Sequence, residues 1–233
     1  MSTQENSSAR GFWNLLGDKE QAALAGLGAT RDFKPGATMC HEGEPATYLY
    51  VLVTGWVKII KVTSEGDERM QALRGNGDVV GEMAGEISGA MAGRRTATLE
   101  AVGPVRALIV LHDRFHAFLD GNPQAGRAYR KALTQRMRDT AAQLSQQPVT
   151  SGAQRLALRL LELAERHGTE ANGVVEVVIP LSQKELASLS GTSRATVTRA
   201  LRNWRDRGIV RTGPRHVTIT DVAGLRNIAA YRD

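Results

Sequence analysis

The chain has 233 residues, a formal net charge of +6 and a pI near 9.8, and this length favours two domains, each able to bury a core. Its single cysteine, Cys40, excludes an internal disulfide and a cysteine-ligated iron–sulfur cluster, which fits a reducing cytoplasm. The polar start lacks an apolar signal region and no apolar run reaches the roughly 20 residues of a membrane helix, so we expect a soluble, cytoplasmic protein with no membrane partner.

The first half of the chain changes from helical to β patterning. Residues 1–11 are polar and predict a disordered tail, whereas residues 12–27 carry apolar residues at helical spacing. From residue 33 to 110, short runs rich in Val, Ile, Leu and Tyr alternate with turn signals, and this rhythm predicts an all-β barrel or roll. The strongest hairpin candidate is the run 57–62, which is followed by a turn at residues 64–67.

Helical spacing returns at residue 113 and continues to residue 147. Residues spaced 4, 3 and 4 apart form a heptad seam, namely Leu133, Met137, Thr140 and Leu144. Such a seam is long enough to pair two subunits as a coiled coil, and the alternative is a helix packed against its own domain. Residues 148–152 then break the helix and predict a hinge.

After the hinge, residues 155–167 predict an amphipathic helix, and residues 174–179 predict a short strand. The inward-facing leucines of the helix are Leu156, Leu160, Leu161 and Leu163. Residues 208–220 have the pattern of two short strands around a Gly-Pro-Arg turn, which places Arg215 at the tip of a β-wing suited to a backbone phosphate.

Residues 181–210 carry the features of a helix-turn-helix. Ser182 and Glu185 form a capping box, Gly191 permits the sharp turn, and Ser193 caps a second helix. One face of that helix is apolar and comprises Val197, Leu201 and Trp204. The other face comprises Arg194, Thr198, Arg199, Arg202 and Arg205. Guanidinium groups on this face suit phosphates or the O6/N7 edge of guanine.

The charge distribution agrees with a double-stranded DNA partner for the C-terminal domain. Residues 151–233 hold 13 Lys+Arg and 8 Asp+Glu, a net +5, whereas the first 150 residues hold 17 and 16, a net +1. Seven arginines lie between Arg194 and Arg215, with a single acid, Asp206. The alternative is an ordinary helical hairpin with a solvated face, which usually mixes signs.

A second set of polar residues lies in the β-patterned region. Gly81 permits a close approach of backbone N–H groups to an anion, and Arg95 offers a bidentate fork to a phosphate. Thr96 adds a hydroxyl donor, and Glu82 is an acceptor that suits a ribose hydroxyl. These residues are complementary to a phosphorylated sugar, and the alternative is turn chemistry with a surface salt bridge.

Together these segments resemble the Crp–Fnr transcription regulators from about residue 12 to residue 221. The resemblance depends on the run Tyr50–Val57, on Gly77-Asp78 with Gly81-Glu82, on Arg95–Thr98, and on the helix-turn-helix. It implies an α+β protein with an N-terminal β-roll, a long dimerisation helix and a C-terminal winged helix-turn-helix. The implied segments are a tail (1–11), a cyclic-nucleotide-binding-like double-stranded β-helix (12–112), the dimerisation helix (113–147), a hinge (148–152) and the DNA-binding domain (153–233).

The resemblance also implies residue roles. Gly81, Arg95 and Thr96 would contact a cyclic phosphate, Glu82 would bind the ribose 2′-hydroxyl, and Met83 adjoins them. Thr140 would meet the adenine edge. The implied DNA-binding residues are Ser193, Arg194, Thr198, Arg199, Arg202 and Arg215, of which Arg194 and Arg199 would read guanines.

Three features depart from the family's pattern, two of them at the nucleotide site and one, Ala195, at the DNA-reading helix. The loop 85–93 is longer and richer in glycine, Ala141 replaces a serine that contacts the base, and Ala195 replaces a glutamate that accepts from cytosine. Loss of one hydrogen bond costs about 0.5–1.5 kcal/mol, so cyclic AMP affinity falls by roughly tenfold at most.

Other residue pairs suggest neither a metal nor a haem. Cys40 and His41 are adjacent on an expected strand and would point to opposite faces. His112 and His116 are spaced i, i+4 without a third ligand nearby, so we expect a surface pair rather than a zinc site. No nucleophile–base constellation stands out, which argues against an enzyme.

The sequence therefore predicts a homodimeric transcription regulator that binds a pseudo-palindromic operator and responds to cyclic AMP, with RNA polymerase as a partner if it activates. One alternative is a regulator of the same fold that needs no cyclic nucleotide or answers to another effector. A second is a nucleotide-binding module that regulates a protein partner.

Overall fold

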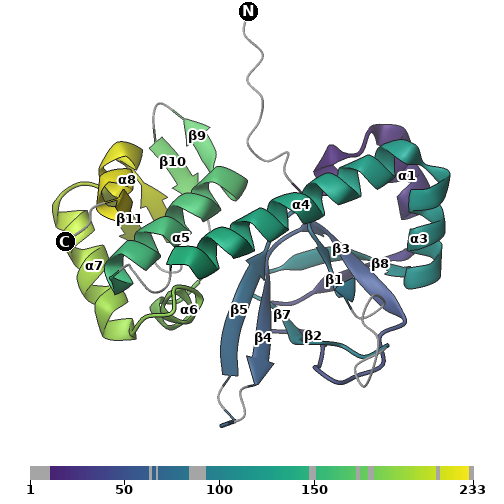
Figure 1. Ribbon diagram of the computed structural model, residues 1–233, viewed down its shortest axis with the longest axis horizontal. Coiled ribbons are helices and arrows are strands. Elements are labelled where there is room, and N and C mark those ends of the chain that lie inside the picture. The colour runs from purple at the N-terminus through teal and green to yellow at the C-terminus, as the bar shows by residue number, and fades with distance from the viewer. Residues whose placement is uncertain are drawn as a thin grey trace, which may run out of the picture. The chain divides into compact units, whose positions relative to one another are not determined.

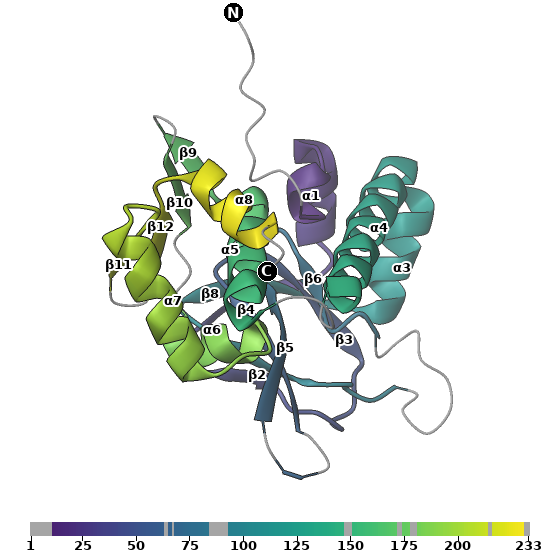
Figure 2. The ribbon, with the colours of Figure 1, turned by 60° about the vertical axis from the view of Figure 1, so that its left-hand side comes forward.

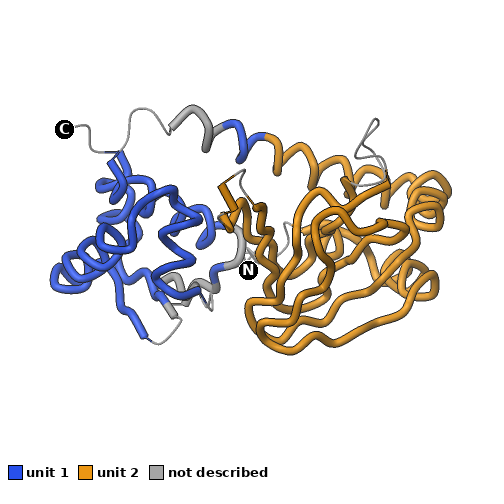
Figure 3. Tube along the Cα trace, turned by 90° about the horizontal axis from the view of Figure 1, so that it is seen from below, with its two compact units in different colours: residues 1–8, 138–233 blue, residues 9–137 orange. Residues whose placement is uncertain are grey.

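The computed structural model describes residues 11–62, 65–66, 68–83, 93–146, 151–171, 174–177, 181–213 and 216–230 (Figure 1). The described residues form two compact units, which divide between Met137 and Arg138 (Figure 3). The first unit along the chain is drawn in orange in Figure 3 and is labelled unit 2 in its key. It contains η1 (Trp13–Leu15), α1 (Asp18–Ala25), β1 (Ala29–Phe33), β2 (Thr38–Cys40), β3 (Tyr48–Thr54), β4 (Val57–Val62), β5 (Glu68–Arg74), β6 (Val79–Val80), β7 (Thr98–Ala101), β8 (Val105–Leu111), α3 (His112–Gly121) and most of α4 (Pro123–Gln146). The second contains the end of α4, α5 (Gly152–His167), β9 (Thr169–Ala171), β10 (Val174–Val177), α6 (Gln183–Leu189), α7 (Arg194–Asp206), β11 (Val210–Gly213), β12 (His216–Ile219) and α8 (Val222–Ala230).

The predicted β-roll consists of two four-stranded antiparallel sheets. One sheet has the order β1-β8-β3-β6 and the other has the order β2-β7-β4-β5. In the first sheet, Tyr50 on β3 lies opposite Ile109 on β8. The hairpin expected after the run 57–62 is confirmed, because β4 pairs with β5 from Val57 opposite Arg74 to Val62 opposite Glu68.

Strand β3 separates two parts of the hydrophobic core. Successive side chains of a strand point to opposite faces, so Leu49 and Val51 pack on one side and Tyr50 and Leu52 on the other. Leu49 and Val51 contact the cluster that contains Phe115 of α3, whereas Tyr50 and Leu52 lie inside the roll. All four β3 residues are fully or almost fully buried, which holds this strand rigidly beside the residues described below.

The helical stretch expected over residues 113–147 consists of two helices rather than one. Pro123 is the first residue of α4, where its missing N–H costs no helical hydrogen bond. Asn122 separates the helices, and its Nδ2 donates to the carbonyl of Phe118 at 2.8 Å. Helix α3 lies beside the first half of α4 (Figure 2).

On the expected seam of α4, Leu133 is half-buried and Met137 is 73% exposed, while the side chain of Leu144 lies outside the described set. None of the helices in the described ranges is long and apolar enough to span a bilayer.

The second unit has a small sheet of order β11-β12-β10-β9 with helices beside it. Three of the four expected inward leucines of α5 are buried, and the exception is Leu161, which is half-buried because it lies at the edge of the apolar stripe. The expected strand is present as β10, and the wing is present as β11 and β12. The sequence analysis missed β9 and also α8, whose Leu225 is fully buried.

Candidate functional site: an anion site and a basic helix-turn-helix

Arg95 is a buried cation with two nitrogens that no described residue bonds. The residue is 2% exposed, and its guanidinium carbon lies 4.6 Å from the ring centroid of Tyr48 and 5.5 Å from that of Tyr50. Its Nη1 donates to the carbonyl of Gly81 at 3.3 Å. Within the described residues, Nε and Nη2 have no hydrogen-bond partner. A buried charge is stable only when it is paired and hydrogen-bonded, so the position suits an anion that accepts from both atoms.

Tyr50, whose ring lies close to the Arg95 guanidinium, is held in its neutral form. Burial, followed by the hydrogen bond with Tyr48, raises the pKa of Tyr50 well above its usual range. Tyr50 therefore stays protonated, and its hydroxyl donates to the carbonyl of Met39 at 2.7 Å. Neutral ring faces attract a guanidinium, which keeps Arg95 in place without neutralising its charge.

Gly81 is required beside Arg95 for a steric reason. Its φ is +82°, a conformation that residues with a side chain rarely adopt. A Cβ at this position would also collide with Nη1 of Arg95. We call Gly81, Glu82 and Arg95 the anion site, because the structure brings these three predicted residues together.

Glu82 is already paired in this structure, by a residue that the sequence analysis missed. Glu82 is 8% exposed, and Oε1 accepts a hydrogen bond from Nη1 of Arg136 on α4. Nη2 of Arg136 donates to the carbonyl of Val79 at 3.0 Å and lies 3.8 Å from Oδ1 of Asp78. Helix α4 is therefore bonded directly to the anion site.

The remaining residues predicted to bind a nucleotide are less enclosed. Thr96 is half-buried directly after Arg95, whereas Met83 is 55% exposed. Thr140 is exposed on α4 in the second unit, and its contact with a base stays a prediction. Residues 84–92 of the glycine-rich loop lie outside the described residues.

The expectation of a surface pair at His112 and His116 is wrong. His112 is 8% exposed, and its ring stacks on that of His116 with centroids 6.4 Å apart and planes inclined at 18°. Because α3 begins directly after β8, the backbone N–H of His112 donates to Thr47 at 3.1 Å and the residue is held against the sheet. In the described ranges, no three His, Cys, Asp or Glu residues cluster as metal ligands would.

Cys40 and His41 separate as expected, since Cys40 is buried and His41 is exposed. Burial raises the pKa of the Cys40 thiol, which keeps the residue in its neutral form.

In the second unit, the first helix and the turn of the helix-turn-helix have the predicted local bonds. Oγ of Ser182 accepts from the N–H of Glu185 at 3.2 Å, and Oε2 of Glu185 accepts from the N–H of Ser182 at 2.8 Å. Gly191 has a φ of +58° in the turn. Arg155 of α5 holds this turn, since Nε donates to the carbonyl of Ser190 at 3.1 Å and Nη2 to that of Gly191 at 2.7 Å. The sequence analysis missed this role of Arg155.

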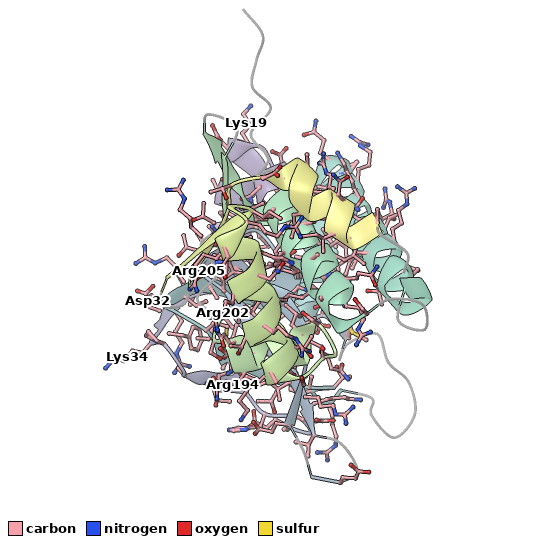
Figure 4. All side chains as sticks on the ribbon, turned by 90° about the vertical axis from the view of Figure 1, so that its left-hand side faces the viewer. Lys19, Asp32, Lys34, Arg194, Arg202 and Arg205 are labelled. Atoms are coloured by element: carbon pink, nitrogen blue, oxygen red, sulfur yellow. The ribbon has the colours of Figure 1, made fainter. Side chains whose placement is uncertain are left out.

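Helix α7 has a buried face and an exposed basic face. Oγ of Ser193 accepts from the N–H of Thr196 at 3.1 Å and caps the helix as predicted. The buried face comprises Val197, Ala200, Leu201 and Trp204. The exposed face includes Arg194, Thr198, Arg199, Arg202 and Arg205. Figure 4 shows Arg194, Arg202 and Arg205 along this helix.

The hydroxyl of Thr198, on the exposed face, is hydrogen-bonded within the protein. Its hydroxyl lies 2.7 Å from Oε1 of Gln183 on α6 and 2.9 Å from the carbonyl of Arg194. Arg205 Nε lies 3.8 Å from Oδ1 of Asp206, the single acid of this segment. Arg215, predicted at the tip of the wing, lies outside the described residues.

Comparisons with known proteins agree with this geometry. Residues 30–122 match the cyclic nucleotide-binding domain, and residues 154–228 match the Crp-like helix-turn-helix domain. A "CRP-like cAMP-activated global transcriptional regulator" of Mycobacterium tuberculosis is 34% identical over 190 residues, which cover 82% of this chain and 83% of that protein. The chain belongs to the Crp–Fnr family of DNA-binding transcription regulators.

Two further members of this Crp–Fnr family illustrate its range. A "Cyclic AMP receptor protein" of Thermus thermophilus is 30% identical over 199 residues, which cover 85% of this chain and 87% of that protein. The solved structure of FixK2 from Bradyrhizobium japonicum superposes with a TM-score of 0.72 at 22% identity, covering 88% of this chain and 99% of that one. This second likeness supports the fold: an N-terminal β-rich nucleotide-binding domain followed by a C-terminal helix-turn-helix.

Proposed function

We propose that this regulator acts as a homodimer whose sequence-specific binding to DNA is controlled by cyclic AMP. The observation that carries the proposal is Arg95, whose Nε and Nη2 are buried and have no partner within the described residues. A cyclic phosphate supplies oxygens that accept from both atoms. The names of the relatives from M. tuberculosis and T. thermophilus, which refer to cyclic AMP, support the same ligand.

The proposed contacts assign one part of the nucleotide to each group of residues. Arg95 neutralises the phosphate, while the backbone at Gly81 and the hydroxyl of Thr96 donate to it. Glu82 accepts from the ribose 2′-hydroxyl. Thr140, four residues beyond Arg136 on α4, meets the adenine, and Met83 adds apolar contact.

The proposed control of DNA binding operates through α4. A ligand shifts a conformational equilibrium only by its differential affinity for the two states. Because Arg136 of α4 donates to Glu82, a ribose hydroxyl that binds Glu82 changes the bonding of the helix that would form the dimer. In the DNA-binding state, two α7 helices separated by about 34 Å, one turn of B-DNA, would read a pseudo-palindrome in double-stranded DNA.

A second candidate function is supported by the Arg136–Glu82 ion pair. The carboxylate proposed for the ribose is already paired, and Ala141 lacks the hydroxyl that the family's cyclic AMP pattern supplies. A regulator of the same fold that answers to another effector, or to none, agrees with both facts. If the protein is an activator, RNA polymerase is a further partner in either case, and the site of action is the cytoplasm.

Selection of binding sites from random duplexes, with and without cyclic AMP, tests the proposal. We expect enrichment of a two-fold symmetric sequence that depends on cyclic AMP. Calorimetric titration with cyclic AMP, cyclic GMP and cyclic di-GMP identifies the effector, and an Arg95→Met variant serves as the control that lacks the phosphate contact. Enrichment that is identical with and without nucleotide, together with no heat from any of the three, favours the second candidate. No enrichment under any condition overturns both.

A further inference from the structure

His112 is an ionisable group beside the anion site that the proposed contacts do not use. It is 92% buried, because 8% of its surface is exposed. Within the described residues, neither Nδ1 nor Nε2 has a hydrogen-bond partner. A buried imidazole normally donates from one nitrogen and accepts at the other, so this arrangement is costly unless a ligand completes it.

The backbone places His112 next to the strand that supports Arg95. The N–H of His112 donates to the carbonyl of Thr47 at 3.1 Å, and Leu111 lies directly opposite Tyr48 in the ladder of β3 and β8. The guanidinium of Arg95 lies 4.6 Å from the ring centroid of the same Tyr48. His112 and Arg95 therefore both lie at the same end of β3.

Four charged or titratable groups act on the His112 imidazole. Arg95 and His116 disfavour its protonation, whereas Asp113 and Glu82 favour it. Burial is the largest influence and Arg95 the second, and together they hold the pKa of His112 below its ordinary value. The free protein therefore has a neutral His112 at pH 7.

We propose that His112 is a further ligand-responsive residue of the anion site, which gains a proton when an anionic ligand binds Arg95. The proposal deepens the function proposed above and rests on it. A bound phosphate compensates the positive charge of Arg95, which removes the stronger of the two electrostatic repulsions on an imidazolium at His112. The protonated ring then adds a second positive charge beside the ligand, and both of its nitrogens become donors.

The direction of the pH effect follows from linkage. The pKa of His112 is depressed in the free protein and rises when the ligand compensates Arg95. The protein takes up protons on binding only between these two pKa values, so ligand affinity increases as the pH falls through that window. With one proton involved, the affinity changes by at most about tenfold per pH unit. Above and below this window, we expect the contribution of His112 to ligand affinity to be independent of pH.

Titration calorimetry of the full chain with cyclic AMP tests the inference, because a cyclic phosphodiester keeps its charge across the range in which histidine titrates. Measurements between about pH 5 and pH 8, each in two buffers of different ionisation enthalpy, give the number of protons taken up. We expect an uptake of up to one proton per site, and its loss in a His112→Phe variant, which keeps a ring against His116. The matched control is His116→Gln on the same helix, in which the uptake persists.

Each outcome decides the matter. Cyclic AMP binding without proton uptake, or an uptake that persists in His112→Phe, overturns the inference and leaves the proposed function intact. No binding of cyclic AMP at any pH overturns the proposed function and the inference with it. If His112→Phe fails to fold, the imidazole C–H resonance of the unaltered protein gives the same answer. A His112 pKa that is the same with and without cyclic AMP refutes the idea.

Discussion

The substitution Arg95→Met removes a buried cation, and we expect it to change both the affinity for cyclic AMP and the stability of the free protein. Arg95 offers Nε and Nη2 to a ligand, and each hydrogen bond to a charged group contributes about 1.5–3 kcal/mol. Loss of both removes about 3–6 kcal/mol of binding free energy, which corresponds to about a 10²- to 10⁴-fold weaker affinity for cyclic AMP. The same substitution acts in the opposite direction on the stability of the free protein.

In the free protein, each desolvated and unpaired donor costs about 1–3 kcal/mol. The contacts of the guanidinium with Tyr48 and Tyr50 stabilise the folded protein by about 0.5–2 kcal/mol each, and the hydrogen bond to Gly81 contributes about 1 kcal/mol. The costs slightly exceed the favourable contacts, so we expect the free energy of unfolding of Arg95→Met to rise by about 0.5 kcal/mol, which raises the Tm by about 1–2 °C.

Calorimetric titration and thermal unfolding without nucleotide measure the two effects on the same samples. The matched control is Arg94→Met, which removes an exposed arginine that donates to the carbonyl of Gly43 at 2.8 Å. We expect the control to keep its affinity for cyclic AMP. If the Arg95→Met protein is less stable than the parent and binds cyclic AMP with unchanged affinity, the assignment of Arg95 as the residue that binds the phosphate is refuted.

Four further substitutions test the DNA-binding unit. We expect Arg199→Ala to weaken binding to the selected operator by about 1–3 kcal/mol and to have a smaller effect on binding to random DNA. Arg215→Ala is expected to weaken binding to both kinds of DNA equally. Gel-shift titrations in which both variants show the same pattern of affinity loss on the two kinds of DNA contradict these roles. Arg155→Met removes two hydrogen bonds to the carbonyls of the turn. We expect the free energy of unfolding, measured with urea, to fall by about 2 kcal/mol. An unchanged free energy of unfolding would mean that these two bonds do not stabilise the turn. Ser182→Ala removes one half of the capping box and lowers stability by about 1 kcal/mol in the same assay, and restoration by Ser182→Asp but not by Ser182→Val identifies the cap as the cause.

Features determined by neighbouring residues were predictable from the sequence. The capping box at Ser182, the turn at Gly191 and the cap at Ser193 each depend on contacts within a few positions, and all three are present. Gly81 and Glu82 were recognisable for the same reason, since both belong to one short segment. Arg95 was identified by residue type, although its burial was not.

Features that depend on long-range contacts were missed. Arg136 bonds Glu82 across 54 positions, and Arg155 bonds Ser190 across 35, so no local spacing signals either pair. The burial of His112 has the same origin, because it depends on how α3 begins against the sheet. For Arg136 the available signal was weak: a basic residue four positions before Thr140 on the helix expected to reach the ligand.

The hydroxyl of Thr198 has a single proton, and this proton is directed to Gln183 or to the carbonyl of Arg194. What remains available toward DNA is the pair of oxygen lone pairs. Phosphate oxygens and the guanine O6/N7 edge present only acceptors, so they repel this atom, whereas the exocyclic amino groups of adenine and cytosine in the major groove match it. The amide oxygen of Gln183 accepts from Thr198, and its NH₂ group remains a donor. Gln183 can therefore donate to the phosphate and guanine acceptors to which Thr198 cannot donate.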